Sequence, residues 1–478
     1  MNYRFVFYTL GMVLNIAGAC MFLPLICALC YSEPLVPVFL IYIALCFLFG
    51  VPFTLKRPEN RSMYAKEGFV IVASSWIIIS LFGALPFIVS GYIPNFFDAF
   101  FETVSGFTTT GASILTNVEA FPKSLLFWRS FTHWLGGMGV LVFLVAILPS
   151  SGGANFYLMQ AESTGANVSK LVPKVKSTAK LLYSMYLGFT VSETLLLLLG
   201  GLPLYDSLTL TFGTVGTGGF GILNSSVAAY SPYVQWIITI FMILCGIDFS
   251  VYHLILLRKF RALRHSEEAG CYLGIIAVAT ALICVNCWDY FNGFWDALRH
   301  VLFQVGSIIT TTGFTTADFN TWPDISKSIL LILMFVGACA GSTGGGFKVS
   351  RIVVLIKSLM KQIKITIHPK RTYKLKMNGR TVEHETLRAI NVFLVAYLTV
   401  LILSVLIISR DNLGFTTNFT AVLATLNNIG PGLDLVGPTG NFASFSWLSK
   451  LVLTFCMLFG RLEIFPMLIL FARSTWKK

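Results

Sequence analysis

Long apolar stretches separated by short polar segments dominate this chain. An α-helix needs about 20 apolar residues to cross the hydrocarbon core of a bilayer. Ten stretches meet this requirement, namely 6–30, 36–55, 68–90, 124–148, 178–200, 233–257, 270–291, 328–357, 387–409 and 447–472. The pattern therefore predicts an all-α integral membrane protein with ten membrane spans.

Four of the segments that join these spans share a second pattern, a moderately apolar stretch followed by a stretch rich in Thr and Gly. They are FDAFFETVSGFTTTGAS (97–113), YDSLTLTFGTVGTGGFG (205–221), WDALRHVLFQVGSIITTTGFT (295–315) and TNFTAVLATLNNIGPGL (417–433). An Asp or Asn near each start is expected to cap a short helix. A glycine follows 13, 12, 17 and 12 residues later, at Gly111, Gly218, Gly313 and Gly430. The third short helix is therefore predicted to be about one turn longer than the others.

Non-helical backbone is tolerated at membrane depth only where protein or water satisfies its polar groups. We therefore expect the last eight spans to form four helix–pore-loop–helix repeats around one pore. The expected units are an N-terminal pair of spans (1–60) and pore repeats 1 (61–150), 2 (151–265), 3 (266–375) and 4 (376–478). The alternative, four ordinary loops on the outer surface, does not account for their common place between paired spans.

Composition and charge agree with this topology. The chain is 56% hydrophobic and only 12% charged, whereas soluble domains carry about 25% charged residues. The net charge of +13 would suit nucleic-acid binding, but 27 of the 34 basic residues fall in segments on the side of the N-terminus. The positive-inside rule then predicts that both termini are cytoplasmic, with the lipid bilayer as partner and no nucleic acid.

The Thr- and Gly-rich strands are expected to bind a dehydrated monovalent cation. Backbone carbonyls can replace the water of such an ion, and glycine permits the dihedrals that turn them inward. The expected oxygen ligands are Thr109, Thr110, Gly111, Gly216, Thr217, Gly218, Thr311, Thr312, Gly313, Asn428, Ile429 and Gly430. None of these strands carries an acidic residue, which disfavours a calcium site. The ion is therefore expected to be K⁺, and no organic cofactor is expected.

A glycine-rich break interrupts the eighth span. Three consecutive glycines weaken a helix, each by about 1 kcal/mol relative to Ala. We expect Gly341, Ser342, Thr343, Gly344, Gly345 and Gly346 to form a gate loop below the filter. A phosphate-binding loop is disfavoured because Phe347 separates Gly346 from Lys348, and close helix packing explains only Gly337 and Gly341. Arg461, in the middle of the tenth span, is expected to face the pore and contact this loop, and the alternative is a structural ion pair away from the pore axis.

Other ionisable groups inside the spans leave two alternatives open. Glu193 and Asp248 are interpreted as helix-packing hydrogen-bond groups, but either could also carry a coupling proton in a proton- or sodium-coupled transporter. An enzyme would need a nucleophile–base pair or a metal cluster, and we find no such grouping in the sequence. His133 is interpreted as a packed residue.

Several motifs together resemble the Trk/Ktr/HKT superfamily of cation transporters and, within it, the membrane subunits of bacterial Trk potassium uptake systems. They are TVSGFTTTGAS (103–113), HWLGGMGV (133–140), TTTGFTTADF (310–319), GACAGSTGGGFKVSR (337–351) and NNIGPGL (427–433). The resemblance implies one filter glycine per repeat and a gate in the glycine-rich loop. It also implies a location in the bacterial inner membrane, a homodimer and a cytosolic regulatory subunit that binds nucleotides.

Overall fold

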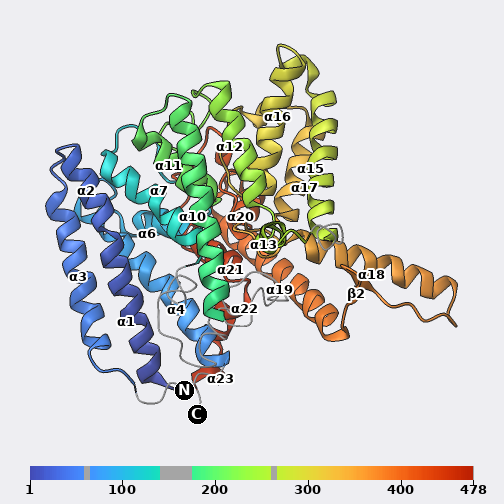
Figure 1. The fold of residues 1–478 in the computed structure, drawn as a ribbon, viewed down its shortest axis with the longest axis horizontal. Helices are drawn as coiled ribbons and strands as arrows, with labels where there is room; N and C mark the ends of the chain where they lie inside the picture. The colour runs from blue at the N-terminus through green and yellow to red at the C-terminus, as the bar shows by residue number, and fades with distance from the viewer. Residues whose placement is uncertain (59–64, 140–174, 260–265, 477–478) are drawn as a thin grey trace.

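The computed structural model describes the chain except for residues 59–64, 140–174, 260–265 and 477–478 (Figure 1). Its α-helices are α1 (Tyr3–Cys20), α2 (Phe22–Cys30), α3 (Val36–Thr54), α4 (Ala65–Gly83), α5 (Leu85–Val89), α6 (Phe96–Phe107), α7 (Lys123–Gly137), α10 (Val175–Leu199), α11 (Leu204–Val215), α12 (Pro232–Cys245), α13 (Phe249–Leu256), α15 (Glu267–Asn286), α16 (Phe294–Ile309), α17 (Asp324–Val336), α18 (Val349–Ile367), α19 (His384–Ile408), α20 (Phe415–Leu426), α21 (Trp447–Arg461), α22 (Phe465–Phe471) and α23 (Arg473–Trp476). Within these described ranges, β structure is confined to a hairpin of β1 (Lys376–Met377) and β2 (Arg380–Thr381). The chain is therefore all-α.

Several helices are long and apolar enough to cross a membrane. Among the described residues they number six, or seven if the bent pair α12–α13 counts as one span. Their outward faces carry bare apolar side chains, such as Leu48, Leu199 and Val285, which are 65%, 80% and 80% exposed. Apolar surface of this extent is unfavourable in water and is accommodated by lipid. The chain is therefore a membrane protein.

Some predicted spans are not straight helices. The span predicted over 233–257 consists of α12 and α13, which are bent by 92° at residues 246–248. The span predicted over 447–472 is broken between α21 and α22, where Glu463 and Ile464 have φ of 55° and 66°. The expectation of continuous helices was therefore wrong in both places, because hydropathy reports composition and not chain direction. The end of the span predicted over 124–148 lies outside the described residues.

The first pair of spans packs closely through small residues. Helices α1 and α3 run side by side (Figure 1). A Cβ atom placed on Gly11 would lie 2.8 Å from the carbonyl oxygen of Gly50, so the two backbones touch at this crossing. Small residues permit such close approach between membrane helices, where dispersion contacts replace the hydrophobic effect.

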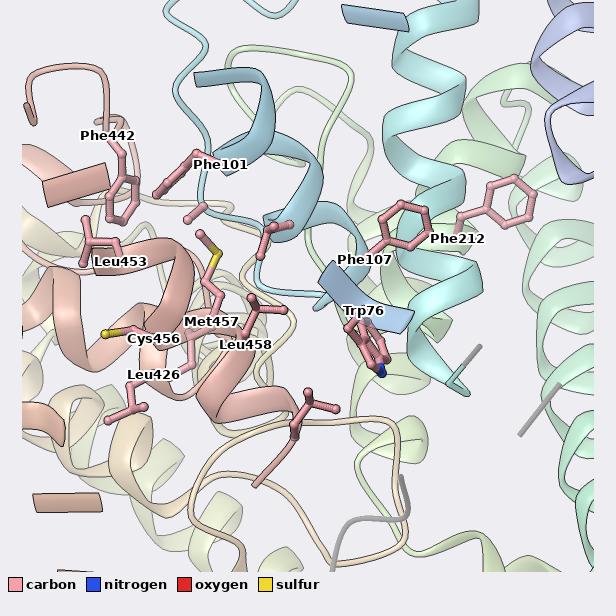
Figure 2. Packing of buried hydrophobic residues seen from close by; sticks show 14 of the residues in the cluster. Trp76, Phe101, Phe107, Phe212, Leu426, Phe442, Leu453, Cys456, Met457 and Leu458 are labelled. Carbon is pink, nitrogen blue, oxygen red and sulfur yellow. The ribbon is translucent and has the colours of Figure 1, made fainter. Parts of the chain in front are cut away.

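Four short helices, α6, α11, α16 and α20, are enclosed by the longer ones. Their C-terminal halves are almost entirely buried. Figure 2 shows the packing beside α6, where Phe101 lies near Phe442 with ring centroids 5.5 Å apart. On the other side of α6, the rings of Phe107 and Trp128 meet edge to face at 5.9 Å. These contacts fix the position and direction of the short helix.

The short helices have 12, 12, 16 and 12 residues, so the predicted extra turn in the third one is present. The predicted capping residues are wrong. The residues at the N-caps are Asn95, Pro203, Gly293 and Gly414. The acidic residues of the pattern lie in the first helical turn, where a negative charge still stabilises the positive end of the helix dipole.

Candidate ion filter and gate loop

All four short helices end in the same backbone turn. The residue after each helix cap has a left-handed φ of 56° at Thr109, 52° at Thr217, 59° at Thr311 and 55° at Asn428. The next N–H bonds back to the carbonyl five residues earlier, at 2.9 Å from Thr110, 2.8 Å from Gly218, 2.8 Å from Thr312 and 2.9 Å from Ile429. The four segments therefore share one local conformation despite different sequences.

A glycine with positive φ follows two residues after each left-handed residue. The values are 77° at Gly111, 78° at Gly219, 87° at Gly313 and 97° at Gly430. The prediction that Gly218 corresponds to Gly111, Gly313 and Gly430 is therefore wrong by one residue. Gly219, and not Gly218, takes this position in the second segment. Gly216 correspondingly caps α11, as Thr108 caps α6. The error arose because the two adjacent glycines cannot be distinguished by composition.

The four glycines lie against one another's segments in a closed order. A Cβ on Gly111 would lie 2.1 Å from the carbonyl oxygen of Gly218, and one on Gly219 would lie 2.0 Å from that of Thr312. A Cβ on Gly313 would lie 2.1 Å from the carbonyl oxygen of Ile429, and one on Gly430 would lie 2.8 Å from that of Thr110. The contacts run from the first segment to the second, third and fourth and back to the first. Any side chain at these glycines would collide with backbone.

The strands beyond the glycines are held from behind by polar side chains. The Glu102 carboxylate accepts from the N–H of Ile114 at 3.0 Å and pairs with Arg129 at 2.6 Å, with both side chains almost fully buried. The guanidinium of Arg129 also donates to the carbonyl of Gly221 at 3.0 Å. This ion pair ties the first segment to the second. An Arg inside an apolar span was the sequence signal for it, which the sequence analysis did not use.

Two other segments use a side chain of their own short helix in the same way. The side-chain oxygen of Gln304, in the amide orientation that satisfies both of its polar atoms, accepts from the N–H of Thr316 at 2.8 Å. The hydroxyl of Thr420 accepts from the N–H of Leu433 at 3.0 Å. The backbone of these strands is therefore fixed by hydrogen bonds rather than left to fluctuate.

The predicted break in the eighth span is present and lies against the ends of the short helices. Helix α17 ends at Val336 and α18 begins at Val349. The N–H of Gly345 donates to the hydroxyl of Thr311 at 2.6 Å. A Cβ on Gly345 would lie 2.5 Å from the carbonyl oxygen of Asn427. The glycines therefore let the loop approach two of the four segments directly.

The broken pair α12–α13 and helix α15 hold the loop from the other side. The N–H of Phe249 donates to the carbonyl of Gly341 at 3.1 Å. The carboxylate of Glu268, on α15, accepts from the N–H groups of Ala340 and Ser350 at 2.7 and 3.1 Å. The ammonium of Lys348, a buried residue that the sequence analysis passed over, donates to the carbonyl of Gly344.

Arg461 lies between the loop and the first segment. Its guanidinium donates to the carbonyl of Thr343 at 3.1 Å and to the hydroxyl of Thr109 at 3.3 Å. It also donates to the carbonyl of Gly137 at 2.8 Å. The predicted contact between Arg461 and the glycine-rich loop is therefore present. Glu463 instead pairs with Arg351, at 2.5 Å.

The remaining membrane acids differ in their surroundings. Asp248 caps α13 and accepts from the N–H of Ser250 at 2.9 Å, as expected for a packing group. Glu193 is fully buried in α10, and the hydroxyl of Thr214, on α11, lies beside its carboxylate. The interpretation of Glu193 as a helix-packing group therefore stays a prediction, with Thr214 as its neighbour on α11.

Comparisons with known proteins agree over the whole chain. The TrkH family, described as "Cation transport protein", matches residues 35–282 and 295–478. The Trk system potassium uptake proteins TrkH of Salmonella typhimurium and of Escherichia coli K12 are each 35% identical, with 100% of both chains covered. The crystal structure of the potassium transporter TrkH from Vibrio parahaemolyticus is similar with a TM-score of 0.88 and 31% identity, again over 100% of both chains. The chain belongs to the TrkH family of cation transport proteins.

Proposed function

We propose that this chain takes up potassium ions across the bacterial inner membrane through one pore. Its ten spans comprise an N-terminal pair (1–60) and four helix–pore-loop–helix repeats that enclose the ion path. The observation that carries the proposal is the closed order of contacts among Gly111, Gly219, Gly313 and Gly430. As a member of a family of cation transport proteins, the chain is not an enzyme.

The filter consists of backbone and hydroxyl oxygens from the four segments. With the second segment in its corrected register, the ligands are Thr109–Gly111, Thr217–Gly219, Thr311–Gly313 and Asn428–Gly430. Each short helix directs its C-terminal end toward its segment, and the partial negative charge there favours a cation. K⁺ is the transported ion because rings of neutral oxygens suit a monovalent cation that has lost its water.

The gate is the loop Gly341–Gly346 together with Arg461. The loop contacts Thr311 by a direct hydrogen bond and therefore lies next to the inner end of the filter. Arg461 adds a positive charge beside the same point. In this position the loop blocks the ion by its backbone and the arginine repels it, so conduction requires both to move.

The test is ion flux into vesicles that contain the purified chain. Gly313→Ser is expected to reduce the ratio of potassium to sodium flux, because the added side chain meets the carbonyl oxygen of Ile429. Gly201→Ser is the matched control, since Gly201 has a similar φ of 84° with no atom within 4 Å of an added Cβ. An unchanged flux ratio in Gly313→Ser would show that this segment does not select the ion.

A second candidate function is proton- or sodium-coupled potassium transport. The fully buried carboxyl group of Glu193, which has no basic partner among the residues that the structure describes, favours it, because such a group is costly to ionise and is stable when it carries a proton. Reversal potentials separate the two functions. A channel follows the potassium gradient alone, whereas a coupled transporter shifts its reversal potential with the proton or sodium gradient.

The remaining proposals concern assembly and topology. We propose a homodimer with both termini in the cytoplasm. A cytosolic subunit that binds nucleotides would regulate the gate by docking on the basic segment 348–388. This segment includes α18, which extends away from the other helices (Figure 1) and leads directly from the gate loop.

A further inference from the structure

The second filter segment lacks a side chain that the other three possess. Between the left-handed residue and the glycine stand Thr110, Thr312 and Ile429 in the first, third and fourth segments, all with buried side chains. The second segment has Gly218 at this place. A Cβ on Gly218 would lie 2.2 Å from Cγ and 2.4 Å from Nδ1 of His133, a residue of α7. The imidazole ring thus fills the space behind this strand.

Both nitrogens of this ring are bonded. Nδ1 of His133 lies 2.7 Å from the carbonyl oxygen of Gly106, and the N–H of Phe220 donates to Nε2 at 3.2 Å. The carbonyl can only accept and the Phe220 N–H can only donate. The proton of the neutral imidazole is therefore on Nδ1, and Nε2 is the acceptor. The ring is fully buried and cannot turn without losing both bonds.

These two bonds join two different repeats. Gly106 is in the last turn of α6, the short helix of the first segment, and Phe220 directly follows Gly219. In the first and third segments, the residue nine positions before the glycine is Glu102 or Gln304, which accepts from the strand. The corresponding residue of the second segment is Leu210, which has no acceptor. His133 supplies this strand with an acceptor from a neighbouring helix, at the residue directly after the glycine rather than three residues after it.

We propose that His133 is a positioning residue for ion selectivity, which fixes the second filter strand by an acceptor nitrogen and by the volume of its ring. This inference rests on the proposed filter. A strand without this support would let the Gly218 carbonyl move away from Gly111, and the four oxygens would no longer match one ion size. Neutral His133 supports the strand, whereas a ring protonated on both nitrogens would point a second N–H at the N–H of Phe220.

The experiment measures the ratio of potassium to sodium flux in vesicles for the full chain and its variants. His133→Ala is expected to lower the ratio about fivefold, the effect of losing roughly one hydrogen bond. Gly218→Thr alone is expected to abolish selective flux because its side chain collides with the ring. The double variant His133→Ala/Gly218→Thr has at this place the threonine found in the first and third segments. It is expected to have a higher ratio of potassium to sodium flux than either single variant.

Two further variants keep the outcomes separate. Gly219→Ala tests the filter itself. If Gly219→Ala and His133→Ala both leave the ratio of potassium to sodium flux unchanged, the proposed filter is wrong. If Gly219→Ala lowers the ratio and His133→Ala does not, the filter stands and the role of His133 is overturned. Where His133→Ala does not yield folded protein, His133→Gln retains an acceptor and His133→Leu does not. A higher flux ratio in His133→Gln than in His133→Leu supports the role, and equal ratios overturn it.

Discussion

Removing the Glu268 carboxylate is expected to loosen the gate loop. Its oxygen accepts from the N–H groups of Ala340 and Ser350, which lie on either side of the glycine-rich stretch. Glu268→Ala removes both bonds at once and leaves the loop tied through the α12–α13 pair, Thr311 and Arg461. If the observed position of the loop closes the pore, the variant must shift the equilibrium toward the open position.

The size of the shift follows from the environment of the carboxylate. A hydrogen bond to a charged group contributes about 1.5–3 kcal/mol. Glu268 is 9% exposed, so water can replace part of the loss, and we take the lower end for the two bonds together. About 1.4 kcal/mol corresponds to a tenfold change in an equilibrium constant. Basal flux is therefore expected to rise about tenfold in Glu268→Ala.

Rubidium tracer efflux from vesicles that contain the chain alone measures this flux. Glu268→Gln should lie between wild type and Glu268→Ala, because the amide oxygen still accepts but carries no charge. The matched control is the preceding residue, Glu267, whose half-exposed side chain pairs with Lys357. A surface pair contributes 0–1 kcal/mol, so Glu267→Ala should leave the flux nearly unchanged. Wild-type flux in Glu268→Ala, or an equal rise in Glu267→Ala, would refute the reasoning.

The remaining predictions address the gate charge, the buried ion pair and the N-terminal helices. Arg461→Gln should raise basal flux by removing the barrier charge, and unchanged flux would exclude a gating role. Arg129→Met should lower the free energy of unfolding by about 3–5 kcal/mol, because it leaves Glu102 buried without a partner. Unfolding in detergent measures this, and adding Glu102→Met should recover much of the loss; a larger loss in the double variant would contradict the argument. Gly11→Val should lower the unfolding temperature through its contact with Gly50 without changing the flux ratio, and a changed ratio would show that this helix pair influences the filter.

Spacing along the sequence was sufficient to predict the short helices but not their ends. The longer third helix followed from residue counts, because a helix converts sequence distance into length. The Asp or Asn near the start of each segment suggested a cap, yet the observed caps Asn95 and Gly293 lie three residues before Asp98 and Asp296. Capping depends on where the chain enters the helix, which is a tertiary property.

The register of the second segment required three-dimensional contacts. In TGGF either glycine fits the pattern. The positive φ of Gly219, the carbonyl of Thr312 against Gly219 and the ring of His133 against Gly218 distinguish them. The bend between α12 and α13 was missed for a related reason. Its residues are apolar enough to continue a span, and Asp248 was interpreted as a packing group when it also caps a new helix.

The proposed filter and the proposed gate are joined by hydrogen bonds, and this limits how the pore can open. The hydroxyl of Thr311 bonds the loop N–H of Gly345, while Arg461 bonds both Thr109 of the filter and Thr343 of the loop. A loop that moves aside must therefore break hydrogen bonds to residues at the inner end of the filter. The freed hydroxyl of Thr311 then becomes available to replace water around an ion. In the proposed mechanism, opening thus removes the obstacle and completes the inner oxygen site in one movement, so changes at the loop should alter selectivity as well as flux.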